Sequence, residues 1–226
     1  CSNTGLSDAA RDVFLGYHNE ARLRVAQGIE PNNVGYLNPA KNMYKLQLAI
    51  IQEWDCAMEQ QAQDAIATCP SSLGSWSNMG QNLIRWSSSA GFSNPAGQIN
   101  SSLANWWGKA KQYGVTDPDN KYTSSSLYSF ANMVFAETTK IGCAYQVCGN
   151  YLTVTCLYNA IAYYTNGVMW QTGTACTAGS QCTTYANSGC AAGLCTKGAD
   201  VPGERSAQAI LSKDKPFLIT GKIHEK

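Results

Sequence analysis

Ten cysteines constrain this chain more than any other feature of its sequence. Their number is even, no two form a CxxC motif, and only two histidines are present, so a zinc-binding module is disfavoured. Five disulfides in an oxidising compartment are the better interpretation, because cytosolic proteins rarely carry so many cysteines. Six of them are spread widely, whereas four are grouped at Cys176, Cys182, Cys190 and Cys195. We therefore expect one medium core and a small disulfide-rich appendage.

The charge of the chain excludes some classes of partner. Charged residues make up 14% of the 226 residues and the formal net charge is +1, so the chain as a whole provides no electrostatic footprint for nucleic acid or for an anionic membrane. No apolar run reaches the length that spans a membrane. The chain begins at Cys1 without a charged and apolar leader, so we interpret it as a mature secreted protein whose signal peptide has been removed.

The segment 138–158 predicts a β-hairpin around which the rest of the chain packs. Ile141, Cys143 and Tyr145 alternate along its first half, and a β-branched run that ends at Cys156 forms the second. Gly149-Asn150 between them tolerates the backbone angles of a tight turn, so the two strands are antiparallel. Opposed cysteines on neighbouring strands can bridge, which makes Cys143–Cys156 a plausible cross-strand disulfide.

Apolar residues at helical spacing predict three helices. The first covers about 8–27, and the second covers 54–69 with Cys56 and Cys69 near its two ends. The third opens at Asn94-Pro95, and its apolar face consists of Ala96, Ile99, Leu103, Trp106 and Ala110. Helices with interleaved strands predict an α+β fold in which helices surround an antiparallel sheet.

The segments between and after these elements complete the expected organisation. We expect 70–94 to be a loop with one short strand near 82–86, and 130–135 to lead into the hairpin. Residues 173–196 have too little apolar volume for a core and must be held by their own disulfides. The tail, 197–226, is expected to dock on the body (residues 1–172) or on a second copy of the chain, and an engineered origin is the alternative.

Several short phrases, in this order, resemble one family. The first predicted helix carries His18-Asn19-Glu20-Ala21-Arg22, and the loop before the predicted strand carries Gly80-Gln81-Asn82-Leu83. Phe130-Ala131-Asn132-Met133-Val134-Phe135 precedes the hairpin. Together they resemble the CAP superfamily (SCP/TAPS: cysteine-rich secretory proteins, antigen 5, pathogenesis-related 1). The segment that ends Gly193-Leu194-Cys195 is most similar to the activation-associated secreted proteins of parasitic nematodes.

The resemblance implies a three-layer α-β-α sandwich with a central antiparallel sheet, which we expect for residues 1–172. It also implies the disulfides Cys56–Cys148 and Cys143–Cys156. We assign Cys1–Cys69 as a third and expect the last four cysteines to pair among themselves. Sequence alone does not fix this connectivity.

Members of the family typically hold a divalent metal with two histidines and two glutamates in a central groove. At the matching positions this chain has Gln81, Lys109 and Ser129, and it has no histidine between Pro70 and Leu73. An amide and an ammonium cannot serve as such ligands, so we expect no metal and no other cofactor. The resemblance gives His18 a packed, structural role. Whether the three substituted residues line a polar cleft or face solvent is left open.

These observations favour a secreted, non-enzymatic protein that acts by surface recognition, with an unidentified host protein or receptor as its partner. The first alternative is binding or export of a sterol or fatty acid, motivated by the apolar, aromatic-rich third helix and tail. A metal-dependent or serine-type hydrolase is the lower alternative, because no acid–base pair is visible. Asn100-Ser101-Ser102 is one candidate acceptor for a glycan, and a homodimer would explain an ordered tail.

Overall fold

The structure is a computed structural model, and it describes residues 1–46, 54–92 and 95–199. The described helices are α1 (Asp8–Ala26), α2 (Cys56–Ile66), α3 (Pro95–Trp107), α4 (Lys109–Tyr113) and α5 (Tyr128–Val134), with the 3-10 turns Ser125–Leu127 and Gly179–Gln181. The described strands are β1 (Ala40–Lys41), β2 (Gly80–Ser87), β3 (Ile141–Cys148), β4 (Tyr151–Tyr158), β5 (Gln171–Thr172), β6 (Gly189–Ala191) and β7 (Leu194–Thr196). None of the described helices is long and apolar enough to cross a membrane.

The predicted hairpin is confirmed as the centre of the main sheet. Strands β3 and β4 pair antiparallel with Cys143 opposite Cys156, and β2 pairs with the other edge of β4. Gly149 occupies the turn with φ +57°, a backbone conformation that glycine adopts without strain. The strand predicted at 82–86 is β2, which is longer than expected.

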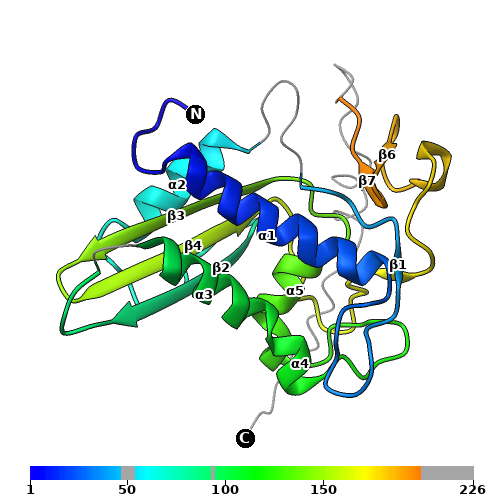
Figure 1. The fold of residues 1–226 in the computed structure, drawn as a ribbon, viewed down its shortest axis with the longest axis horizontal. Helices are drawn as coiled ribbons and strands as arrows, with labels where there is room; N and C mark the ends of the chain where they lie inside the picture. The colour runs from blue at the N-terminus through cyan, green and yellow to red at the C-terminus, as the bar shows by residue number, and fades with distance from the viewer. Residues whose placement is uncertain (47–53, 93–94, 200–226) are drawn as a thin grey trace, which may run out of the picture.

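Alternation along the strands separates two apolar layers. Residues such as Cys143 and Val154 belong to the large core with α1, α3 and α5, whereas Ala144 and Leu157 pack against Met58 and its neighbours on α2. The sheet therefore lies between α2 on one face and the other helices on the opposite face (Figure 1). This arrangement confirms the predicted three-layer α-β-α sandwich.

Several predicted boundaries are wrong for local reasons. The second helix begins at Cys56, because the Asp55 side chain caps it by accepting the backbone N–H groups of Ala57 and Met58. It ends at Ile66, so Cys69 lies beyond it and has φ +52°. The third helix is interrupted before α4, and residues 130–134 belong to the short helix α5, with Phe135 as its C-cap.

The disulfides of the first 156 residues differ from the expected pattern. The structure joins Cys1 to Cys56 and Cys69 to Cys148, so the pairings Cys56–Cys148 and Cys1–Cys69 are wrong. The cross-strand disulfide Cys143–Cys156 is confirmed. The last four cysteines pair among themselves as expected, in the disulfides Cys176–Cys190 and Cys182–Cys195.

The direction of α2 along β3 explains the exchanged partners. The backbone N–H of Asp55, just before the helix, donates to the carbonyl of Ile141 at the start of β3 (3.2 Å). Helix and strand therefore begin together, and Cys148 at the end of β3 meets Cys69 beyond the end of the helix. Cys56 lies at the other end of a helix of 11 residues, about 16 Å away along its axis, and bridges to the N-terminus instead.

Disulfide mapping provides a direct check of this connectivity. Digestion without reduction should release one peptide pair that contains Cys1 and Cys56 and another that contains Cys69 and Cys148. Mass spectrometry before and after reduction would identify both pairs. A pair that links Cys56 to Cys148 would contradict the described direction of α2.

The cysteine-rich segment is attached to the body by backbone pairing and by a buried tyrosine. Cys195 donates its N–H to the carbonyl of Met43 (2.9 Å), and its carbonyl accepts the N–H of Lys45 (2.7 Å). The buried Tyr44 hydroxyl bonds to the Ser188 hydroxyl at 2.8 Å. The division at 172 and 196 stays a prediction, and the tail from 200 onward lies outside the described residues.

Candidate functional site

Gln81, the first of the three residues at the implied metal-ligand positions, does not face solvent. Its side chain is 2% exposed, and its Oε1 accepts hydrogen bonds from the backbone N–H of Gly74 (2.7 Å) and from Trp76 Nε1 (3.0 Å). Its Nε2 donates to Thr155 Oγ1 on β4 (3.0 Å). The amide therefore fastens the segment after α2 onto the face of the sheet.

The hydrogen-bond directions at this point require an amide. The partners of Oε1 are N–H groups, which only donate, and this fixes which end of the Gln81 amide is oxygen. The Thr155 hydroxyl donates to the carbonyl of Asn82 (2.7 Å), so only its lone pairs are left for position 81. A carboxylate there would place an oxygen against another acceptor, and the buried site would lose a hydrogen bond.

Replacing Gln81 by glutamate should therefore destabilise the protein, although glutamate is the residue of the family's metal site. We expect a loss of about 1–3 kcal/mol in the free energy of unfolding at neutral pH, because one buried acceptor pair would be left unsatisfied. Urea denaturation followed by circular dichroism measures this loss in the free energy of unfolding. The control is Gln112→Glu on α4, where the side chain is exposed and the change should cost little. Equal stability of the Gln81→Glu variant and the unchanged protein would contradict the assigned role of the amide.

Ser129 and Lys109 are also engaged by neighbouring groups. The Ser129 hydroxyl on α5 donates to the carbonyl of Trp106 (3.2 Å), and the Ser129 carbonyl accepts from Asn82 Nδ2 (2.8 Å). Lys109 opens α4, where its Nζ lies 3.4 Å from Gln112 Oε1 and 5.9 Å from the centre of the Tyr113 ring. Both residues thus stabilise local helix contacts.

The residues at these positions do not fit a divalent metal. The Gln81 oxygen already accepts two hydrogen bonds, the Ser129 hydroxyl is used by a backbone carbonyl, and Lys109 carries a positive charge. Within the described residues, one group of side chains has metal-like spacing, namely the sulfur atoms of Cys176, Cys182 and Cys195. All three sulfurs are in disulfides, so they offer no thiolate ligand.

His18 has the structural role that the sequence predicts. It is completely buried, and its Nδ1 lies 2.7 Å from the carbonyl of Phe14, which can only accept a hydrogen bond. Nδ1 therefore carries the proton, and Nε2 accepts from the Tyr158 hydroxyl at 3.0 Å. Burial lowers the pKa of His18 to about 4, so the imidazole is neutral at physiological pH.

This depressed pKa predicts how stability depends on pH. The unfolded state binds a proton at His18 near pH 6.5, whereas the folded state resists protonation down to about pH 4. The contribution of His18 is therefore complete above about pH 6.5 and is lost as the pH falls toward 4. Denaturation midpoints between pH 4 and 7 would measure this loss, and a His18→Gln variant should show a smaller pH dependence over that interval. The same pH dependence of the denaturation midpoint in the unchanged protein and in the His18→Gln variant would contradict the assigned contribution of His18.

A buried amide network next to the substituted positions was missed by the sequence analysis. Asn132 Nδ2 on α5 donates to Asn82 Oδ1 on β2 (3.0 Å), and Asn82 Nδ2 lies 3.3 Å from the Tyr158 hydroxyl. Both asparagines are almost fully buried. Their position in otherwise apolar segments was the available signal, because buried amides are normally kept for specific hydrogen bonds. The network joins the helix that carries Ser129 to the strand that carries Gln81.

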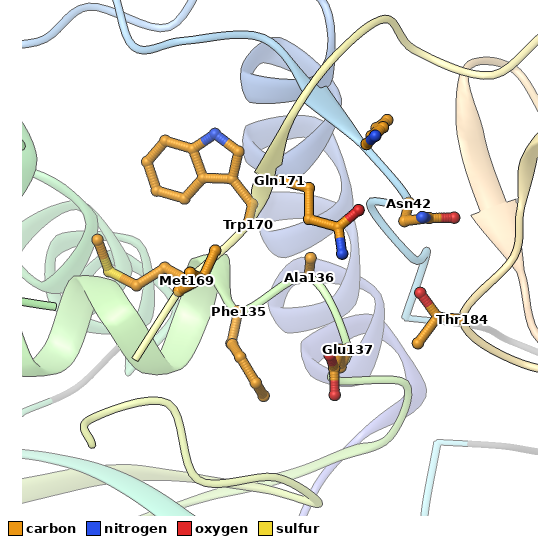
Figure 2. A pocket seen from close by; sticks show the side chains of 10 residues that line it. Asn42, Phe135, Ala136, Glu137, Met169, Trp170, Gln171 and Thr184 are labelled. Atoms are coloured by element: carbon orange, nitrogen blue, oxygen red, sulfur yellow. The ribbon is translucent and has the colours of Figure 1, made fainter. Parts of the chain in front are cut away.

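A small cleft lies elsewhere, at the junction of the body and the cysteine-rich segment (Figure 2). Asn42, Ala136, Met169, Gln171 and Thr184 are among its lining residues, and none of the predicted site residues borders it. Its volume is about 60 Å³. Pockets for small-molecule ligands are usually about 300–1,000 Å³, so this cleft has room for a few waters only.

Comparison with known proteins relates this chain to one family of secreted proteins. Residues 15–158 match the CAP family, described as the cysteine-rich secretory protein family. Ancylostoma secreted protein of Ancylostoma caninum is 56% identical over 202 residues, which is 89% of this chain and 46% of that protein. Venom allergen 5 of Vespa velutina is 30% identical over 146 residues, 62% of this chain and 67% of the allergen.

Solved structures show the same relation. The crystal structure of Na-ASP-1 superposes with a TM-score of 0.85 and 56% identity, covering 89% of this chain and 49% of that one. The crystal structure of NaASP2 with Zn²⁺ gives a TM-score of 0.72 and 25% identity over 86% of this chain and 99% of that one. This chain therefore spans about half the length of Ancylostoma secreted protein and of Na-ASP-1.

The family match covers more than half of the chain, and the layered fold and the disulfide-rich end agree with it. The similarity to Ancylostoma secreted protein supports the predicted relation to the activation-associated secreted proteins of parasitic nematodes. With its helix–sheet–helix sandwich and its five disulfides, the chain belongs to the CAP family of cysteine-rich secretory proteins.

Proposed function

We propose that this chain is a secreted CAP protein that acts in a host by surface recognition and catalyses no reaction. The observation that carries the proposal is the engagement of Gln81 and Ser129, whose polar atoms hold the fold together at positions where the family places metal ligands. The names of its relatives, a secreted protein and venom allergens, support release from the producing organism. The five disulfides agree with an oxidising, extracellular environment.

The chemistry of the remaining candidate groups supports a non-enzymatic role. Catalytic histidines need access to substrate and a pKa near the working pH, whereas His18 is sealed in the core with its pKa lowered to about 4. All ten cysteines are in disulfides, so none can act as a thiolate nucleophile.

Binding to host material in the presence and absence of a chelator tests the proposal. Immobilised protein should bind a host serum or cell-surface component saturably, and EDTA should leave the apparent Kd unchanged. A heat-denatured sample controls for non-specific adsorption. Absence of saturable binding, or binding that disappears with EDTA and returns with zinc, would contradict it.

Binding or export of a lipid is the second function predicted from the sequence. The structure gives it less support, because the helix that motivated it packs into the core. Ile99, Leu103 and Trp106 of α3 are buried in the main core, so this helix face is not free to line a pocket. Displacement assays with cholesterol and palmitate test it directly. Saturable binding of either lipid at micromolar concentration would favour the carrier function over recognition.

Two other sequence predictions stay open. Asn100 is exposed on α3, which leaves its side chain accessible as a glycan acceptor. The predicted homodimer depends on the tail, which lies outside the described residues.

A further inference from the structure

A short turn after α1 presents apolar side chains to solvent. The N–H of Leu37 donates to the carbonyl of Glu30 (2.9 Å), Pro31 pairs with Tyr36, and the N–H of Asn32 donates to the carbonyl of Gly35 (3.0 Å). These contacts close a small hairpin over residues 30–37, here called the 30–37 turn. Its tip carries Val34, which is 82% exposed.

The 30–37 turn is fixed to the body at its tip and at its base. The Asn32 side chain donates to the carbonyl of Val115 (2.9 Å) and accepts the N–H of the same residue (3.0 Å). The Glu30 carboxylate accepts from Trp107 Nε1 and from Arg24 Nε, both at 2.6 Å. The chain therefore holds exposed apolar groups in a defined conformation, which lowers the entropic cost of inserting them into a partner.

A second exposed aromatic residue lies on the adjacent helix α4. Tyr36 in the turn is 67% exposed, and Tyr113 at the end of α4 is 47% exposed. Gly114, which follows Tyr113, lies directly against the Asn33 side chain. Figure 1 likewise places the loop between α1 and β1 beside α4. The aliphatic and aromatic groups thus belong to one end of the molecule.

The charges around these groups are positive. Lys109 on α4 has its Nζ 5.9 Å from the centre of the Tyr113 ring, and Lys111 on the same helix is exposed. Glu30, the acidic residue of the turn, is buried in its contacts with Trp107 and Arg24. The nearest carboxylate along the chain, Asp117, is partly buried and accepts the backbone N–H groups of Asp119 and Lys121. The next one, Asp119, forms an ion pair with Lys121 at 2.6 Å. The local surface therefore combines apolar tips with two cationic side chains.

We propose that Val34, Tyr36, Tyr113, Lys109 and Lys111 form a docking surface for anionic phospholipid membranes. Exposed aliphatic and tyrosine side chains enter the headgroup region, where lysines meet acidic lipids. A protruding turn suits a soft membrane surface, whereas a stable protein interface buries about 800 Å² on each partner, with close complementarity. The inference goes beyond surface recognition of a host protein and does not depend on the metal positions.

Co-sedimentation with vesicles tests the docking surface. The protein should sediment with vesicles of equal parts phosphatidylcholine and phosphatidylserine, much less with pure phosphatidylcholine, and less at high salt. Lys109→Gln with Lys111→Gln should weaken binding roughly fivefold per lysine. Val34→Ser with Tyr36→Ser should weaken it by about tenfold or more, and the fold should survive because both side chains are exposed.

A matched control removes the same kinds of group from the β3–β4 end of the sheet. Val147 on β3 is 38% exposed and Arg85 on β2 is exposed, so Val147→Ser with Arg85→Gln should leave vesicle binding unchanged. Circular dichroism confirms that each variant is folded. Equal sedimentation with both vesicle types, no sedimentation at all, or equal loss in the control would each overturn the proposal. Saturable binding to an acidic protein without vesicle binding would overturn it as well.

Discussion

Replacing Arg22 by methionine should prevent this protein from folding. Arg22 on α1 is fully buried, and every N–H group of its guanidinium donates to a backbone carbonyl, with no carboxylate of the described residues among its partners. The acceptors are the carbonyls of Tyr44, Met133, Phe135, Ala136 and Thr138, at 2.8–3.2 Å. The side chain thereby joins the connection between α5 and β3 to the segment after β1, which pairs with Cys195 of the cysteine-rich segment.

The expected effect of this change follows from the number of acceptors that are lost. The carbonyls of Phe135 and Ala136 would keep the backbone N–H groups of Thr138 and Tyr44, whereas those of Tyr44, Met133 and Thr138 would lose the donor that Arg22 provides. Each buried carbonyl without a donor costs about 1–3 kcal/mol, so these three alone reach the lower part of the whole stability of a typical domain, about 5–15 kcal/mol. Burial lowers the pKa of Arg22 to about 9, which leaves the guanidinium charged at neutral pH.

Secretion yield and circular dichroism would detect the failure to fold. Because a protein that does not fold yields no unfolding curve, Arg22→Lys provides the graded measurement. Lysine has three donors and no planar fork, so this variant should fold with a strongly lowered urea midpoint. The matched control is Arg85→Met on β2, where an exposed arginine stacks over Tyr151 and contributes about 1 kcal/mol or less. A normal midpoint for Arg22→Lys would contradict the structural role of the guanidinium.

Adding one methyl group at Gly142 should have the next largest effect. Gly142 is on β3, where the strand lies against the backbone of α2. A side-chain carbon at this position would overlap the backbone N of Glu59 and the carbonyl carbon of Met58. Backbone atoms cannot turn aside as a flexible side chain does, so the helix would have to leave the sheet.

We expect Gly142→Ala to lower the free energy of unfolding by more than about 3 kcal/mol, the upper end of the usual cost of overpacking. Gly16→Ala on α1 is the control, because nothing lies within 4 Å of the added carbon. That control should stabilise the protein by about 0.5–1 kcal/mol, since alanine is the better helix former. Urea denaturation compares the two variants. A Gly142→Ala protein as stable as the unchanged chain would show that α2 does not pack on β3 this closely.

Local sequence features predicted the centre of the fold. The hairpin and Cys143–Cys156 could be found because alternation, a turn dipeptide and two opposed cysteines occur within about 20 residues of one another. The layers around it came from the family resemblance. The partners of Cys56 and Cys69 could not be predicted, since they depend on the direction in which α2 lies along β3. Helix α5 escaped detection because seven residues are too few to show a clear helical period.

Part of the candidate site could likewise be predicted from the sequence, and part of it depends on contacts between distant residues. Gln81, Lys109 and Ser129 are visible in the sequence at the positions where the resemblance implies ligands, and the changed donor set stays a prediction. The new role of Gln81 is not visible, because its partners Gly74 and Trp76 approach it only after the chain has turned back onto the sheet. Of the two alternatives left by the sequence, solvent exposure is wrong for Gln81, because the residue is buried and both ends of its amide are hydrogen-bonded.

Zinc titration by isothermal calorimetry tests the central claim, that former ligand positions now serve the fold, most directly. At neutral pH, and with a control titration into buffer, the protein should show no saturable heat that corresponds to one ion per chain. Ser129→Ala should behave in the same way as the unchanged protein. Binding of one zinc ion per chain at micromolar affinity, abolished by Ser129→Ala or Gln81→Ala, would contradict the account.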